Sequence, residues 1–264
     1  GYPYTKYLNA NMFVDQAAAL LLMSTDAADR LGVPAEKRVY LHGNADTHEK
    51  ILVTERVNYH SSPAVRIGAA HALKQAGVTP ADLAHMDIYS CFSSAVEVAA
   101  DEIGIAQDDS RGLTLTGGLP YFGGPGNNYS MHGIAEVAAR CRANPGAYGL
   151  VFANGGFLTK HSFGVYGTEP PSHEFRWEDV QSEVDREPTR TAIVDWSGVG
   201  TVETWTTPVD RDGQPEKAFL AVRTPEDARV LAVIPDPDGA AATVQDDIAG
   251  ARVRVNDDGT ASLA

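Results

Sequence analysis

Cysteine, basic residues and long apolar runs are all scarce in this sequence. Cys91 and Cys141 are its only cysteines, too few for a disulfide scaffold, so we expect a reducing, cytoplasmic environment. The longest apolar run, residues 17–23, is much shorter than the roughly 20 residues of a membrane-spanning helix, and no signal-peptide pattern begins the chain. A formal net charge of −14 argues against nucleic acids and anionic membranes as partners. We therefore expect neither a membrane span nor a nucleic-acid-binding protein.

Several motifs that carry chemistry are also missing. The sequence has no GxxxxGK[ST] phosphate loop, no regular GxGxxG, no HExxH or CxxC metal pattern and no GxSxG serine nucleophile. His42, His48 and His60 fall in a polar stretch that we expect to be a loop, and their spacing does not predict a metal site. These absences disfavour zinc, phosphate-loop and α/β-hydrolase chemistry.

Up to about residue 170, helical segments alternate with short apolar runs. Ser62 and Pro63 are typical of a helix start, and Gly77 of its end. Residues 13–31 predict a buried strand that leads into a short helix ending at Gly32. Such alternation predicts an α/β layered fold. Further helices are expected at 92–103 and 132–142, and further strands at 86–89, 113–116, 148–153 and 157–166.

The remaining third of the chain has a different sequence pattern. Pro170 and Pro171 begin a polar stretch typical of a linker, so we expect a first domain at residues 1–170, a linker at 171–189 and a second domain at 190–264. The second domain reads as short alternating strands with Asp-Gly turns, which predicts a small all-β barrel of the OB type. Its acidity argues against nucleic-acid binding. Strands are expected at 192–194, 200–207, 218–222, 230–234 and 251–255, with a short helix-like gap at 244–249.

A glycine-rich stretch, GGLPYFGGPGNNYSMHGIAE at residues 117–136, follows an expected strand and precedes an expected helix. Ordering so much glycine costs conformational entropy, so something must come close to this backbone. Three interpretations remain open: a phosphate loop, a tightly packed structural turn, or a loop that lines a pocket for a thioester or acyl chain.

The stretch also carries a recognisable pattern. Thr116-Gly117-Gly118, then Gly123-Gly124-Pro125, then Gly133 to Val137 (GIAEV) resemble the C-terminal half of the thiolase superfamily. Three more segments match in the same order: 14–19 (VDQAAA), 87–92 (DIYSCF) and 153–156 (ANGG). The resemblance covers about residues 1–168, and it is strongest to thiolases of the sterol-carrier-protein type and to thiolase-like proteins labelled acetyl-CoA acetyltransferase. It implies a layered αβα domain, the C-terminal half of a thiolase, followed by the small OB-like barrel, which itself resembles the additional C-terminal domain of thiolase-like proteins.

The resemblance also shows where this sequence departs from the thiolase machinery. Gly124 stands where the family's G-H-P turn carries the basic histidine, and Tyr89 stands where its H-D-C-F segment carries a histidine that polarises the substrate carbonyl. Ala153 replaces the second cysteine, which transfers protons in biosynthetic members. Claisen chemistry needs a thiolate, a base, an oxyanion hole and a proton shuttle, so ordinary thiolysis is put in doubt.

Three residues are the candidates for catalysis. Tyr89 can donate a hydrogen bond or act as a general acid, or it can simply pack at a strand end. His132 lies at the start of the helix after the glycine stretch, where it is a candidate base, although a helix N-terminus disfavours its cationic form. Asn154 offers an amide donor to a carbonyl oxygen, and a turn-forming role is the alternative.

Five further residues are candidates for substrate binding: Gly123, Gly124, Asn128, His161 and Cys91. Cys91 lies at the start of a helix, where the dipole favours a thiolate, but the family's cysteine there is not the nucleophile, so burial in the structure is the alternative.

The resemblance therefore implies an acyltransferase-like protein that acts on an acyl-CoA, transferring or cleaving a carbon–carbon bond in lipid or sterol metabolism. Coenzyme A thioester is the expected substrate, and no covalently bound cofactor is expected. The alternatives are a non-catalytic protein that binds acyl-CoA or lipid, and a retro-aldolase of side-chain degradation. Expected partners are acyl-CoA, the missing N-terminal half of the thiolase fold, and a second copy in a homodimer formed through the thiolase domain. Without that half, the run at 17–23 would lack its strand partners, so we expect low stability of this part alone.

Overall fold

The computed structural model describes residues 2–264, which form two compact units. Tyr7–Glu49 and His60–Glu187 make up the first, here called the α/β unit. Lys50–Tyr59 and Pro188–Ala264, with the segment up to Lys6, make up the second, here called the β unit. The chain therefore leaves the α/β unit after Glu49 and returns to it at His60.

A mixed four-stranded sheet is the centre of the α/β unit. The strand order is β1-β4-β3-β2. β2 and β3 are parallel, whereas β4 is antiparallel to both β3 and β1. The carboxyl ends of β2 and β3 consequently lie at the same edge of the sheet. The strands are β1 (Tyr40–His48), β2 (Leu83–Ile88), β3 (Tyr148–Gly155) and β4 (Lys160–Gly167).

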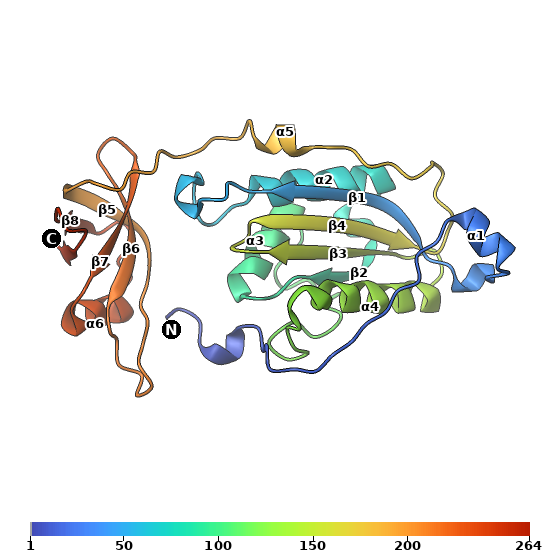
Figure 1. The fold of residues 1–264 in the computed structure, drawn as a ribbon, viewed down its shortest axis with the longest axis horizontal. Helices are drawn as coiled ribbons and strands as arrows, with labels where there is room; N and C mark the ends of the chain where they lie inside the picture. Colours follow the sequence, from blue (N-terminus) through green and yellow to red (C-terminus); the bar gives the residue numbers. More distant parts are fainter. Residues whose placement is uncertain (1) are drawn as a thin grey trace. The chain divides into compact units, whose positions relative to one another are not determined.

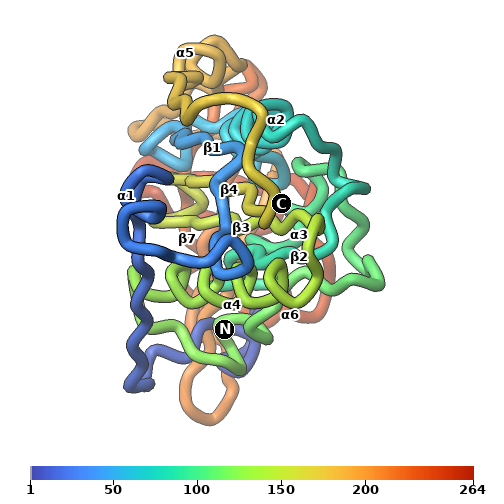
Figure 2. The backbone as a smooth tube through the Cα atoms, turned by 90° about the vertical axis from the view of Figure 1, so that its right-hand side faces the viewer, coloured from blue at the N-terminus to red at the C-terminus, as the bar shows by residue number. Residues whose placement is uncertain are grey.

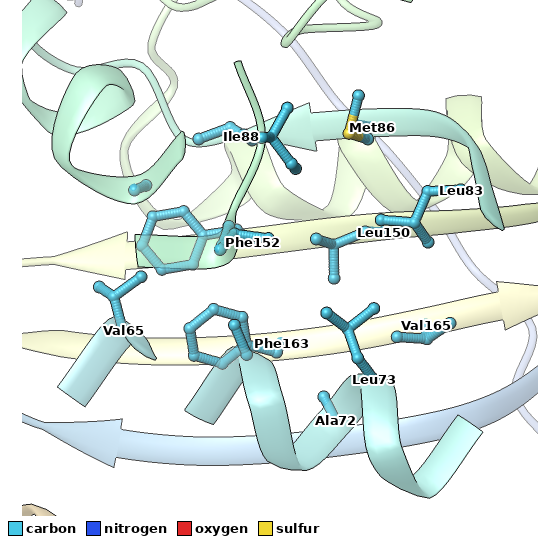
Figure 3. Close-up of a cluster of buried hydrophobic side chains, with 14 of the residues drawn as sticks. Val65, Ala72, Leu73, Leu83, Met86, Ile88, Leu150, Phe152, Phe163 and Val165 are labelled. Carbon is cyan, nitrogen blue, oxygen red and sulfur yellow. The ribbon is translucent and has the colours of Figure 1, made fainter. Parts of the chain in front are cut away.

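Helices cover both faces of this sheet (Figures 1 and 2). α2 (Pro63–Ala76) and α3 (Ser93–Ile103) pack together on one face, and α4 (Tyr129–Ala143) packs against β3 on the other. Alternate residues of β3 serve the two layers: Phe152 belongs to the large core shown in Figure 3, whereas Val151 packs with Val137 and Cys141 of α4. The result is the expected layered αβα fold.

Local signals explain where α2 and α3 begin and end. The Ser62 Oγ accepts a hydrogen bond from the Val65 N–H at 3.3 Å, and Pro63 occupies the first turn. Gly77 ends α2 with φ of 70°, and Gly104 ends α3 with φ of 83°, both in the left-handed region. These predicted boundaries are confirmed.

Three predictions about the α/β unit were wrong. The run at 17–23 is not a buried strand: residues 9–23 form no helix or strand, and Leu21 and Leu22 are 92% and 87% exposed. Only the helical part of that prediction is right, as α1 (Thr25–Arg30), capped by Ser24. Residues 113–116 form no strand, because polar groups of β2 hold this segment instead. The polar stretch that includes His42 and His48 is not a loop but contains the edge strand β1.

The β unit is built on an antiparallel five-stranded sheet of order β7-β6-β5-β8-β9. A bridge between Val233 and Thr260 links β7 to the chain just before β9, which brings the two ends of the sheet together. The helix expected at 244–249 lies earlier in the chain: it has nine residues, begins at Pro237 because Asp236 caps it, and ends at Gln245. The elements are β5 (Gly198–Thr206), β6 (Ala218–Arg223), β7 (Arg229–Ile234), α6 (Pro237–Gln245), β8 (Arg252–Val255) and the unexpected β9 (Ala261–Leu263).

The polar stretch after Pro171 follows the outer edge of β1 within the α/β unit. It contains the short helix α5 (Gln181–Val184). The Gln181 side chain accepts from the His48 N–H at 2.8 Å and donates to the His48 carbonyl at 3.0 Å. A side-chain amide thus occupies the backbone groups that a neighbouring strand would use. The described residues also contain short 3-10 helices: η1 (Lys6–Leu8), η2 (Ala35–Lys37), η3 (Val53–Glu55), η4 (Pro80–Asp82) and η5 (Gly126–Asn128).

Candidate functional site

The ends of β2 and β3 bring three of the candidate residues together. The Asn154 amide Nδ2 donates to the Cys91 Sγ at 3.6 Å, and the Tyr89 N–H donates to the Phe152 carbonyl at 3.2 Å. The other amide atom of Asn154, Oδ1, is buried and has no hydrogen-bond partner among residues 2–264. These contacts form a small polar cluster where two parallel strands end.

His161 joins this cluster from the neighbouring strand. It lies directly opposite Asn154 in the antiparallel pairing of β3 and β4, so the two side chains share one face of the sheet. Its ring stacks on Phe152 with centroids 5.5 Å apart and is 3% exposed. The structure therefore groups Tyr89, Cys91, Asn154 and His161.

Burial sets the protonation state of two of these groups. It raises the pKa of the Cys91 thiol, although the Phe92 N–H and the Asn154 amide act in the opposite direction. Burial also raises the pKa of Tyr89, and the negative charge that Cys91 gains when it ionises at high pH raises it further. Both groups consequently stay protonated at neutral pH. The position of Cys91 before a helix start does not make it a thiolate, because desolvation outweighs the hydrogen bonds that favour the charged form.

The glycine stretch packs against the chain's own N-terminal segment. Gly123 has φ of +116°, and a Cβ there would lie 2.7 Å from the Val14 Cγ1. The Gly124 N–H donates to the Asn11 carbonyl at 2.7 Å, and a Cβ on Gly124 would lie 3.1 Å from that of Ala10. Any side chain at position 124 would therefore press on Ala10. The backbone that comes close to the glycines is thus their own chain.

His132 and Asn128 form a second group on α4. The Asn128 Nδ2 lies 3.2 Å from the His132 Nε2, and because an amide nitrogen can only donate, Nε2 accepts. The His132 ring contacts Phe122 edge-on at 5.2 Å. Phe122 in turn contacts Tyr129, whose ring contacts Tyr89 at 5.2 Å. Aromatic rings therefore lie between His132 and Tyr89.

Asp87, on β2, is a site-shaping residue that the sequence reasoning missed. It is 1% exposed, and its Oδ1 accepts from the Leu115 N–H at 2.9 Å and the Thr116 N–H at 3.2 Å. The Thr116 hydroxyl also lies 2.6 Å from the Tyr129 hydroxyl. Burial raises the pKa of Asp87 despite these hydrogen bonds. Asp87 thus fixes the start of the glycine stretch, and an aspartate at the end of an apolar strand was the signal that could have found it.

An open groove of about 350 Å³ lies next to the polar cluster, on the side where α3 begins. Its lining combines apolar side chains with hydroxyls and one carboxylate, that of Glu97. The lining residues are Leu8, Ser90, Phe92, Ser93, Val96, Glu97, Gln107, Leu113, Thr114, Gly117, Gly118, Pro120 and Tyr121.

Within residues 2–264, no group of histidine, cysteine or acidic side chains is arranged to hold a metal ion. No helix in the same residues is long and apolar enough to cross a membrane.

Comparisons with known proteins agree with this architecture. Residues 179–260 match the family model described as the thiolase-like protein type 1 additional C-terminal domain. Mitochondrial acetyl-CoA acetyltransferases of mouse and human are 31% and 30% identical over 150 residues, and acetyl-CoA acetyltransferase A of Xenopus laevis is 29% identical. Each match covers 56% of this chain and 32% of the relative, so the chain spans about a third of the length of these curated relatives.

The fold is therefore thiolase-like, with an additional small β domain, and the resemblance to the thiolase superfamily is confirmed. Among solved structures, the chain is similar to a monomeric SCP2-thiolase like protein type 1 from Mycobacterium smegmatis. The two are 42% identical with a TM-score of 0.90, over 100% of this chain and 58% of that one.

Proposed function

We propose that this chain is part of a thiolase-superfamily protein that transfers or cleaves a carbon–carbon bond in an acyl-CoA thioester of lipid or sterol metabolism. The observation that carries the proposal is the cluster of Tyr89, Cys91 and Asn154 at the ends of β2 and β3. The catalysis would run without the usual thiolase base, because Gly124 stands where the family carries that histidine and has no side chain. The coenzyme A thioester is the substrate, and no covalently bound cofactor takes part.

A retro-aldol reaction fits the cluster better than thiolysis does, because aldol cleavage needs acid–base groups but no cysteine acyl-enzyme. Cys91, whose pKa is raised by burial, is not required as a nucleophile in such a reaction. In a retro-aldol cleavage, a base takes the hydroxyl proton of a 3-hydroxyacyl thioester, and the C2–C3 bond breaks to give a carbonyl compound and a thioester enolate. The enolate is then protonated at C2. The Tyr89 phenol and the Asn154 amide are the donors for the enolate oxygen, and His132 is the candidate base.

The second candidate function is binding of acyl-CoA or lipid without catalysis. The absence of a base at position 124 favours it, together with the aromatic rings that lie between His132 and Tyr89. In this case the polar cluster would hold the thioester carbonyl, and no bond would change.

The remaining part of the thiolase fold is the proposed partner of the N-terminal segment. Residues 9–23 are exposed along one face, including Met12 and Phe13 at 74% and 87%, and the matched part of the M. smegmatis protein is 58% of that chain. A homodimer formed through the α/β unit and a cytoplasmic location complete the proposal.

Binding and turnover in the full-length protein test these functions. We expect acetoacetyl-CoA to bind in calorimetry with weak or no thiolysis, and a 3-hydroxyacyl-CoA to be cleaved. Tyr89→Phe keeps the ring and deletes the hydroxyl, so cleavage should fall at least about tenfold with little change in binding. Tyr7→Phe is the matched control, since Tyr7 is 87% exposed and is not among the residues that line the groove. Fast thiolysis that Tyr89→Phe leaves unchanged would overturn the catalytic assignment, and binding without any turnover would favour the second function.

A further inference from the structure

Arg229, on β7 of the β unit, is fully buried although its guanidinium carries a charge. Its Nε and Nη2 donate to the two carboxylate oxygens of Glu203 at 2.6 and 2.7 Å. Its remaining N–H groups also need partners, because an unpaired buried donor is costly. Nη1 donates to the carbonyls of Thr54 at 2.7 Å and Arg56 at 2.6 Å. The partners thus come from the segment Lys50–Tyr59, far away in the sequence.

Arg190 also donates hydrogen bonds to the segment Lys50–Tyr59. Its backbone N–H donates to the Glu55 carbonyl at 2.9 Å, and its Nε and Nη2 donate to the Val57 carbonyl at 3.2 and 3.0 Å. The four successive carbonyl oxygens of residues 54–57 therefore all accept from Arg190 or Arg229. These residues include and follow η3, a 3-10 turn whose last carbonyls lack partners within the turn. Such contacts recognise the main chain and not the side chains.

The Tyr59 ring and the hydrogen bonds of Glu49 also hold the segment in place. The Tyr59 ring lies 4.3 Å from the Arg229 guanidinium, close enough for a cation–π contact. Where the segment leaves and re-enters the α/β unit, the Glu49 carboxylate accepts from the Ser62 hydroxyl at 2.8 Å and from the Ala64 N–H at 2.9 Å. Both ends of the excursion are therefore anchored in the unit from which it departs.

From these contacts we infer that the additional β domain is a binding module for a peptide turn, and that its site is filled by this chain's own segment Lys50–Tyr59. The ligand class is a main-chain turn that presents successive carbonyl oxygens to two arginines. Glu203 balances the charge of Arg229, so the site favours neutral carbonyl groups over phosphate. This role does not depend on the acyl-CoA chemistry proposed for the α/β unit.

Hydrogen–deuterium exchange of the whole chain, followed by mass spectrometry, tests this role. Arg229→Met removes the donors but keeps an apolar stem, so exchange across residues 50–59 should rise at least about tenfold while β3 stays protected. Arg223→Met is the matched control: Arg223 pairs with Arg229 across β6 and β7, and its side chain is 45% exposed. It should leave residues 50–59 as in the parent.

A second variant covers the case in which Arg229→Met unfolds the whole β unit. Arg190 lies outside the strands, so Arg190→Met should loosen residues 50–59 and leave β5–β7 protected. Unchanged exchange of residues 50–59 in Arg190→Met, or exchange in the parent at the rate of an unstructured peptide, would overturn the inference.

Discussion

Gly133 of α4 and Asp87 of β2 lie so close that a Cβ on the glycine would be 2.6 Å from the Asp87 Oδ2. The helix can approach the sheet here only because position 133 has no side chain. The same carboxylate holds the start of the glycine stretch through its other oxygen. One contact therefore links the packing of α4 to the shape of the candidate site.

Gly133→Ala should destabilise the protein although alanine is the better helix former. The propensity gain is at most about 1 kcal/mol, whereas the forced contact with a buried carboxylate costs about 1–3 kcal/mol. We expect a lower urea midpoint at unchanged slope. Met131→Ala, at a partly exposed position on the same helix, is the control and should be nearly neutral. An equal or higher midpoint for Gly133→Ala would contradict the packing described.

Asp87→Asn should remove a pH dependence of stability. Burial raises the pKa of Asp87 in the folded protein, so its contribution is most favourable below the unfolded pKa of about 4 and is lost as pH rises through the folded pKa. The free energy of unfolding of the parent should therefore fall relative to the variant as pH rises above about 4 and through the raised folded-state pKa. Urea titrations at several pH values measure this difference.

A second variant at this position separates charge from hydrogen bonding. Asp87→Ala leaves the Leu115 and Thr116 N–H groups without their acceptor, so it should be less stable than the parent at every pH. A pH-independent difference between the parent and Asp87→Asn would show that the carboxyl titrates alike in both states.

Cys91 should react slowly with iodoacetamide at pH 7. Burial raises the pKa of its thiol, and the thiolate is the reactive species, so the rate should keep rising above pH 9, beyond the range of free cysteine. Peptide mapping distinguishes it from Cys141, which is fully buried and whose pKa is raised in the same way. Labelling of Cys91 faster than that of free cysteine at neutral pH would instead indicate an activated nucleophile.

Gln181→Ala should loosen the linker from the edge of β1. The substitution removes both hydrogen bonds to the His48 backbone, each worth about 0.5–1.5 kcal/mol. We expect faster trypsin cleavage after Arg176 and Arg186, read by mass spectrometry. Glu183→Ala, on the same short helix but exposed, should cleave like the parent. Equal rates for both variants would mean that other contacts hold the linker.

The sequence was most informative where the signal was local. The start and end of α2 depend on Ser62, Pro63 and Gly77, which act through their own backbone, and these predictions were confirmed. β1 was missed because its polar residues lie on an edge strand, where one side of the strand faces a linker and not a core. The run at 17–23 was misassigned because apolar composition predicts burial, but it cannot say which polypeptide would cover it.

The candidate site shows the same division. The thiolase resemblance singled out Tyr89, Cys91 and Asn154, and the structure groups them because each follows or ends a strand of a parallel pair. It could not show that Phe122 and Tyr129 would separate His132 from Tyr89, since these ring contacts depend on the path of the glycine stretch. Asp87 escaped notice for a similar reason: its partners lie about 30 positions away in the chain.

The excursion of Lys50–Tyr59 into the β unit also constrains how the gene can be divided or recombined. A polypeptide fragment that begins at Pro188 contains strands β5 to β9 of the β unit but lacks the segment Lys50–Tyr59, which Arg190 and Arg229 bind. If two relatives exchanged their C-terminal regions, Arg190 and Arg229 would come from one protein and the segment Lys50–Tyr59 from the other. Because the hydrogen bonds from Arg190 and Arg229 reach main-chain carbonyls, the segment can vary in its side chains other than Tyr59, while its length and turn must be retained. Insertions or deletions within residues 50–59 should consequently be rarer in descent than substitutions.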